Sequence, residues 1–286
     1  MSLPRFEYRA PETIEDAVAL RHEFGDDALV MAGGLTAMIL LRERLVHPRV
    51  VLSLSGIAAL RRIDTDGGLR IGAMVTHSEV TRSPAVAGIA PLLREACGHV
   101  GSPAIRNMGT LGGNISHADS ASDPAPALLA MNAEAIIAGP GGERRVPLDK
   151  FFRGTLTTAL DGDELLAALF VPRSAAGTHV GFMKYTATSA EAFATVTVAA
   201  SIVCDGAKVC TEARIGLGSV APTPLRARAA EDLLRGRKLT RESIAEAAAA
   251  AAACTDPSSN GQGSAEYRRE MTGVWVRRLL EDIAGT

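Results

Sequence analysis

Two glycine pairs constrain this chain more than any other feature, because each sits at the end of an apolar segment and next to a possible helix start. The pairs are Gly33-Gly34 and Gly112-Gly113, with the hydroxyl residues Thr36 and Thr110 beside them. A glycine pair between a strand and a helix removes side chains and exposes main-chain N–H groups, which can bind a phosphate. An ordinary tight turn would explain either pair alone. Two pairs are what binding a pyrophosphate from both sides requires.

Neither pair fits the common nucleotide-binding motifs. No Gly-Lys-Ser or Gly-Lys-Thr occurs, and neither pair belongs to a Gly-x-Gly-x-x-Gly run followed by an acidic ribose-binding residue. Kinase-like and plain Rossmann folds are therefore disfavoured. The glycine pairs by themselves do not identify the nucleotide.

The first segment of the chain alternates between helix and strand patterns. Thr13 is a good N-cap, acidic residues follow it, and Gly25 is placed to end the helix. A short apolar strand is expected at 28–31, a second helix from 37 and a second strand at 50–52. This part reads as a compact α/β unit.

The following segment begins with a hairpin pattern over 60–73, with turn residues at 65–68. Thr76 and Glu79 have the spacing of a capping box, which predicts a helix start. A helix near 92–100 leads into the longest glycine-rich region, at 101–114. Residues 164–171 then predict a strand that Pro172 closes.

A linker of small and polar residues at 174–178 precedes a segment of different amino-acid composition. The β-branched stretch 193–203 and the stretch 214–219 predict strands, whereas 230–254 and 264–283 predict helices. Strands followed by helices favour an α+β domain. The length of 286 residues suits two domains, each able to bury its own core.

Composition excludes several classes of partner. The chain has 30 Lys+Arg against 32 Asp+Glu, a net charge of −2, which gives no electrostatic reason for nucleic-acid or membrane-surface binding. No signal peptide or run of 18 apolar residues is evident, so no membrane insertion and a cytoplasmic location are expected. Four scattered cysteines lack the spacing of a zinc or iron–sulfur site and are expected to be reduced.

Five segments, in order, resemble signatures of the FAD-binding medium subunits of the molybdenum hydroxylases, the family of carbon monoxide dehydrogenase and xanthine dehydrogenase. The resemblance covers nearly the whole chain. The segments are AGGLT at 32–36, IRNMGTLGGN at 105–114, His117-Ala118-Asp119 with Asp123, GLGSVAPTP at 216–224 and GSAEYRR at 263–269.

The resemblance implies an α+β protein of two domains. Residues 1–175 would form a two-part α/β FAD-binding domain of the PCMH type, with subdomains of about 1–55 and 56–175. Residues 176–286 would form an α+β C-terminal flavoprotein domain with a small antiparallel sheet and helices. The flavin ring of a non-covalent FAD would lie between the two domains.

The resemblance also implies which residues bind the cofactor. Backbone amides of the two glycine loops would hold the diphosphate, Asp123 would hydrogen-bond the FAD, and Leu166 and Lys184 would lie beside the isoalloxazine ring. An aliphatic side chain can pack on that ring, and a cation can stabilise negative charge on the reduced flavin. The loop residues are Ala32, Gly33, Gly34, Leu35 and Thr36 on one side, and Thr110, Leu111, Gly112, Gly113 and Asn114 on the other.

The implied function is electron transfer without a catalytic residue of its own. A large subunit would hold the molybdenum cofactor, a small subunit would hold two [2Fe-2S] clusters, and the flavin would pass electrons to an external acceptor. An (αβγ)2 assembly is expected. The basic pair that the family often carries is absent from 185–192, which bears on how the flavin edge meets its electron acceptor. The sequence leaves NAD, a quinone, a cytochrome and oxygen open as that acceptor.

Two other functions stay open at this point. A self-contained FAD-dependent oxidase or reductase would need an acid or base over the flavin, and the sequence supplies no convincing one. A non-catalytic assembly protein that lost its cofactor would not need intact glycine loops. His77, His99 and His117 are not at metal-binding spacing, and a satisfied hydrogen-bonding group is the expected role of a lone histidine near a loop. Of the three, His117 alone has a case for function, because it borders the second glycine loop.

Overall fold

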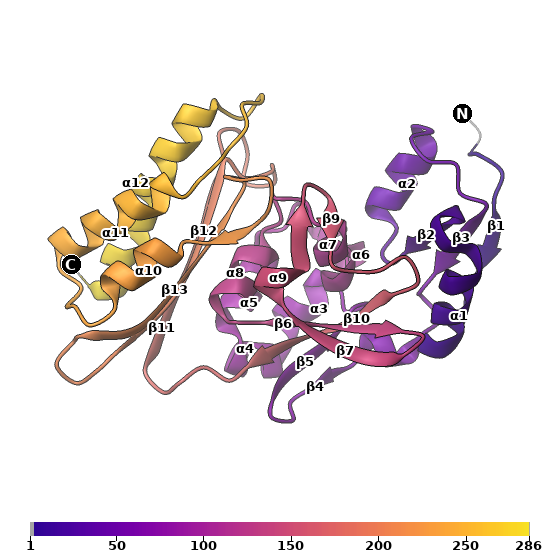
Figure 1. Cartoon of the computed structure of the whole chain (residues 1–286), viewed down its shortest axis with the longest axis horizontal. Coiled ribbons are helices and arrows are strands. Elements are labelled where there is room, and N and C mark those ends of the chain that lie inside the picture. Colours follow the sequence, from indigo (N-terminus) through magenta and orange to yellow (C-terminus); the bar gives the residue numbers. More distant parts are fainter. Residues whose placement is uncertain (1–2, 286) are drawn as a thin grey trace.

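Three sheets, each with its own helices, follow one another along the chain (Figure 1). The structure, a computed structural model, describes residues 3–285. The sheets have three, five and four strands, and a two-stranded ribbon accompanies the second. The two ends of the chain lie at opposite ends of the longest axis. Within residues 3–285 no helix is long and apolar enough to cross a membrane.

The N-terminal sheet is parallel, with strand order β1-β3-β2. Parallel neighbours need crossover connections, and the helices α1 and α2 provide them. Thr13 caps α1 by accepting a hydrogen bond from the Asp16 amide, and Gly25 ends it with φ of 50°. The elements are β1 (Glu7–Arg9), α1 (Ile14–Phe24), a 3-10 turn η1 (Gly25–Asp27), β2 (Ala28–Met31), α2 (Leu35–Arg42) and β3 (Val50–Ser53).

The second sheet is antiparallel, with strand order β4-β5-β10-β6-β7. Its central strand β10 is buried on both faces. Leu166 and Leu169 pack in a core with the helices of this unit, whereas Leu165 and Ala167 pack against the N-terminal unit. The strands are β4 (Ile63–Asp64), β5 (Gly68–Gly72), β6 (Glu134–Gly139), β7 (Gly142–Pro147) and β10 (Leu165–Pro172), with the ribbon strands β8 (Phe152–Gly154) and β9 (Thr157–Thr158).

Short helices supply the other half of this core. Four of them begin with proline at the first turn, where its missing N–H costs nothing. The helices are η2 (Ala58–Arg61), α3 (His77–Arg82), α4 (Pro84–Ile89), α5 (Pro91–Gly98), α6 (Pro103–Met108), α7 (Leu111–His117), α8 (Pro124–Ala130) and α9 (Leu148–Phe151).

The C-terminal sheet is antiparallel, with order β11-β12-β13-β14, and three helices cover one of its faces (Figure 1). Along β12 the alternate residues Val196, Val198 and Ala200 face those helices. The opposite face packs on α8 of the second unit. The elements are β11 (Thr178–Tyr185), β12 (Val196–Cys204), β13 (Cys210–Gly218), β14 (Leu225–Arg226), α10 (Arg228–Leu234), α11 (Arg241–Ala253) and α12 (Ala265–Ala284).

The predicted α+β fold class is confirmed, with sheets of the expected kind in both parts. The capping box of Thr76 and Glu79 forms as predicted. The prediction of helix throughout 230–254 was wrong, because α10 ends at Leu234, where Arg235 is extended and Gly236 follows with φ of 79°, and the Thr240 cap starts α11 afterwards. The glycine-rich region 101–114 contains α6 and the start of α7. The domain boundary at 175 and 176 stays a prediction.

A close backbone contact joins the C-terminal sheet to α8. A Cβ atom on Gly216 of β13 would lie 2.1 Å from the Pro126 carbonyl oxygen, so only glycine fits there. Nearby, the Arg226 guanidinium donates to the Asn132 side chain at 2.6 Å and also pairs with buried Glu231. These contacts fix the C-terminal sheet on the second unit.

We expect Gly216→Ala to destabilise the protein by about 1–3 kcal/mol, since the added methyl must push β13 away from α8. Gly88→Ala is the matched control, because Gly88 lies in helix α4 and a methyl group added there would meet nothing within 4 Å apart from its chain neighbours and the backbone of its own helix. That change should stabilise the helix by roughly 0.5–1 kcal/mol. Urea unfolding of both variants measures the difference, and equal stabilities would contradict the proposed contact.

Candidate functional site

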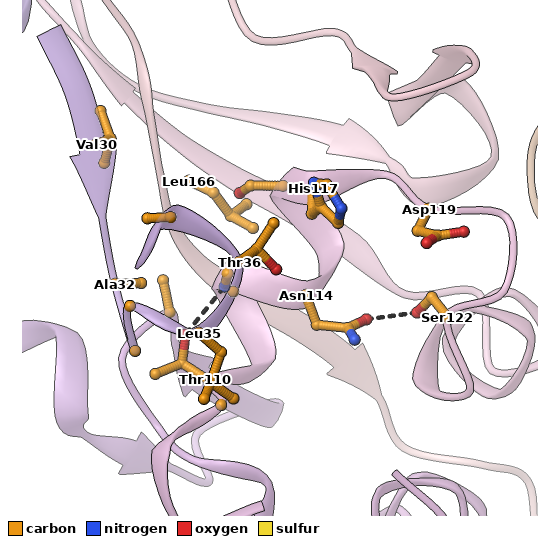
Figure 2. A pocket seen from close by; sticks show the side chains of 18 of the residues that line it. Val30, Ala32, Leu35, Thr36, Thr110, Asn114, His117, Asp119, Ser122 and Leu166 are labelled. Atoms are coloured by element: carbon orange, nitrogen blue, oxygen red, sulfur yellow. Dashed lines mark hydrogen bonds between the residues drawn. The ribbon is translucent and has the colours of Figure 1, made fainter. Parts of the chain in front are cut away.

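A cavity of about 1130 Å³ lies where the first unit, built on the three-stranded sheet, meets the second unit, built on the five-stranded sheet. The cavity extends to the C-terminal sheet. It brings together twelve of the thirteen residues predicted from the sequence: Ala32, Gly33, Gly34, Leu35, Thr36, Thr110, Gly112, Gly113, Asn114, Asp123, Leu166 and Lys184. Leu111 does not line it, because its side chain is fully buried in the core of the second unit. Figure 2 shows residues from both glycine loops around this space.

The two glycine loops touch one another. A Cβ atom on Gly33 would lie 1.9 Å from the Met108 carbonyl oxygen, so a side chain there would drive the loops apart. Gly34 has φ of 79°, a left-handed conformation that suits glycine. Figure 2 shows Ala32 and Leu35 of the first loop beside Thr110 of the second. Both glycines are therefore needed for the shape of the cavity floor.

The first loop presents unpaired backbone amides. Gly34 is the N-cap of α2 and has no side chain to cap the helix. The first amides of a helix have no acceptor within it, and no hydrogen bond is found from the amides of residues 33–37 to any group within 3–285. These residues all line the cavity. The arrangement is suited to a phosphate group, which the positive end of the helix also attracts.

The second loop is different, because the amides of residues 111–114 already have partners. Leu111 N donates to Val75 O at 2.9 Å, and Gly112 N donates to Ala73 O at 3.0 Å. Gly113 N donates to the Thr110 hydroxyl at 3.0 Å, a bond drawn in Figure 2. The resemblance had implied phosphate binding by backbone amides of both loops. Of residues 110–114, only Thr110 has an amide without a hydrogen-bond partner among residues 3–285, whereas five successive amides of the first loop have none.

The glycines of the second loop serve close packing instead. A Cβ atom on Gly112 would lie 2.4 Å from the Ala73 side chain, and one on Gly113 would lie 3.3 Å from that of Ala32. Thr110 and Asn114 are polar residues of this loop that line the cavity. Asn114 accepts a hydrogen bond from Ser122 at 2.5 Å, which leaves its amide nitrogen available to a ligand (Figure 2).

Asp123 and Lys184 form an ion pair on the wall of the cavity, 2.7 Å between Oδ2 and Nζ. Their side chains are only 7% and 4% exposed. Lys184 also donates to the His99 carbonyl at 2.9 Å, whereas Oδ1 of Asp123 is buried without a partner among residues 3–285. Lys184 is thus held in place by groups of the second unit rather than extended into solvent.

Burial raises the pKa of Asp123 to about 6, and the ion pair with Lys184 offsets only part of that effect. A raised pKa in the folded state means that folding favours the protonated carboxyl group. This contribution to stability is therefore complete below the ordinary carboxyl pKa of 3.8 and is lost as the pH rises through about 6.

His77 was not predicted to belong to the site but lies on the cavity wall. It is the first residue of α3, and its amide donates to the Gly109 carbonyl at 3.0 Å. Burial, followed by the charge of Arg106, lowers its pKa to about 4, so the imidazole is neutral at pH 7. The capping box at Thr76 located this residue at a helix start, but no sequence signal placed that helix beside the glycine loops.

Comparison with known proteins agrees with the fold and the cavity. Residues 4–174 match the family model of the FAD binding domain in molybdopterin dehydrogenase, and residues 181–283 match that of the CO dehydrogenase flavoprotein C-terminal domain. The chain therefore belongs to the family of FAD-binding medium subunits of molybdenum hydroxylases, which are oxidoreductases.

Several relatives match over almost their whole length. The carbon monoxide dehydrogenase medium chain of Hydrogenophaga pseudoflava is 36% identical over 97% of this chain and 96% of its own. The nicotine 6-hydroxylase medium subunit of Paenarthrobacter nicotinovorans is 32% identical over 98% of both chains. A solved structure of the Hydrogenophaga carbon monoxide dehydrogenase, lacking the Mo-pyranopterin moiety of its cofactor, matches with a TM-score of 0.95 and 37% identity over 98% of each chain.

We expect Gly33→Ala to weaken FAD binding at least tenfold, because the new methyl group would separate the two loops at Met108. A tenfold loss corresponds to about 1.4 kcal/mol of binding free energy. Gly162→Ala is the matched control, since Gly162 also lines the cavity but has open space around it. Titration with FAD, followed by flavin fluorescence, gives both dissociation constants. Equal affinities for the two variants would argue against the contact between the loops.

Proposed function

We propose that this chain holds FAD in the cavity between its two glycine loops and passes electrons through it within a molybdenum hydroxylase complex. The observation that carries the proposal is the pair of touching loops, which bring unpaired amides and the Asp123–Lys184 pair to one cavity. FAD supplies two-electron redox chemistry when it is bound. The chain's own residues bind, orient and enclose it.

The residues fit the chemical parts of this cofactor. The amides of residues 33–37 suit the diphosphate, which carries the negative charge that a helix N-terminus prefers. Thr36, Thr110 and Asn114 add polar side chains on both sides. Leu166, from the central strand β10, offers an aliphatic surface for the flavin ring. Lys184 brings a positive charge that would favour the reduced flavin.

We further propose that two partner subunits complete the electron path. A large subunit would oxidise the substrate at a molybdenum cofactor, and a small subunit would carry two [2Fe-2S] clusters to the flavin, in an (αβγ)2 assembly in the cytoplasm. The proposal is supported by relatives whose names describe them as medium chains or medium subunits. Among residues 3–285 no group of three His, Cys, Asp or Glu side chains could hold a metal ion.

We expect the isolated chain to bind FAD but not to reduce it with carbon monoxide, aldehydes or N-heterocycles. After coexpression with its partner subunits, the same flavin should be reduced by electrons from the reduced clusters. Anaerobic stopped-flow absorption follows this reduction, and the isolated chain serves as the control. Substrate turnover by the isolated chain would show instead a self-contained flavin enzyme. If the chain binds no FAD, the proposed function is wrong.

A further inference from the structure

The Asp123–Lys184 pair joins the second unit to the C-terminal sheet, and it differs from most ion pairs in its burial. Asp123 precedes α8 and Lys184 is on β11. Both side chains are almost fully buried, and both line the cavity. One carboxylate oxygen contacts Lys184, while the other has no hydrogen-bond partner among the described residues. The unpartnered oxygen can accept a proton without breaking the contact with Lys184.

The other titratable groups near Asp123 do not compete for that proton at neutral pH. Cys97 of α5 is fully buried, and both its burial and the charge of Asp123 raise the pKa of its thiol well above the ordinary value. His99, which ends α5, has its pKa lowered by burial, by Lys184 and by Arg106 of α6, so its ring is neutral. Lys184 is the cation that faces Asp123 from β11.

We propose that Asp123 takes up a proton when the flavin in the cavity is reduced and releases it when the flavin is oxidised. This inference rests on the proposed function. Two electrons arrive from the partner subunits, one proton from solvent joins the flavin ring, and one proton from solvent joins the Asp123 carboxylate. When both electrons leave to the acceptor, both protons return to solvent.

Charge balance inside the cavity explains why the carboxylate would respond. With Asp123 ionised, the ion pair is neutral beside the neutral oxidised flavin. A flavin that has gained two electrons and one proton carries one negative charge. A neighbouring negative charge raises a carboxyl pKa by roughly 1–3 units, and that of Asp123 already stands at about 6. Protonation leaves Lys184 as the counter-charge for the reduced flavin.

The test is the pH dependence of the flavin reduction potential in the FAD-loaded protein. For each proton taken up in a two-electron reduction, the reduction potential changes by about 29.6 mV per pH unit, because one pH unit is a tenfold change in proton concentration. From pH 6.5 to 7.5, between the pKa of about 6 and the higher pKa expected beside the reduced flavin, we expect the wild-type slope to exceed the one-proton value and to approach the two-proton slope, about 59 mV per pH unit. Asp123→Asn should show half that slope.

Glu95→Gln is the matched control. Glu95 lies on α5 outside the cavity, and burial raises the pKa of its carboxyl group as well. Its removal should leave the two-proton slope unchanged. A one-proton slope in the wild type, or a two-proton slope that persists in Asp123→Asn, would overturn the inference.

A second measurement needs no variant and covers the case in which Asp123→Asn fails to fold or to bind FAD. In the reduced-minus-oxidised infrared spectrum of the wild type at pH 7.5, a carboxylic-acid C=O band should appear and should shift after labelling with ¹³C-aspartate. Absence of a shifted band would overturn the inference. Because the bound flavin spectrum reports FAD binding separately, this failure is distinguishable from failure of the proposed function.

Discussion

The contact between the Gly33 backbone and the Met108 carbonyl is the interaction on which the functional part of this protein depends. It joins the parallel N-terminal sheet to the helical side of the second unit, at a distance that no side chain allows. The cavity lies where the loop between β2 and the start of α2 meets the end of α6. The same contact directs the unpaired amides of α2 into the cavity.

The two glycine loops are similar in sequence but have different roles. The second loop is fixed by the bonds of its amides to Val75, Ala73 and Thr110, so it forms a rigid support. The first loop keeps its amides free for a ligand. The C-terminal domain then completes the site with Lys184, which reaches across to Asp123. A cofactor in this cavity would therefore contact residues of the N-terminal unit, the second unit and the C-terminal domain.

Much of this could be predicted from the sequence, because glycine pairs, caps and apolar runs act locally. The short strands around Gly33 and the Thr76 capping box formed as expected. Other features depend on contacts between distant residues. No local pattern showed that Gly112 packs on Ala73, that Leu111 points into the core, or that His77 lies on the cavity wall. The break after Leu234 was missed because the leucine, arginine and lysine residues on both sides of Gly236 favour helix.

Hydrogen–deuterium exchange with and without FAD tests the central claim, that the first loop supplies the amides and the second loop supplies the support. Saturation with FAD should slow exchange strongly at residues 33–37, whose amides are unpaired in the free cavity. Residues 111–113 should change little, because their amides are already bonded. Protection that appears at 111–113 and not at 33–37 would contradict the account.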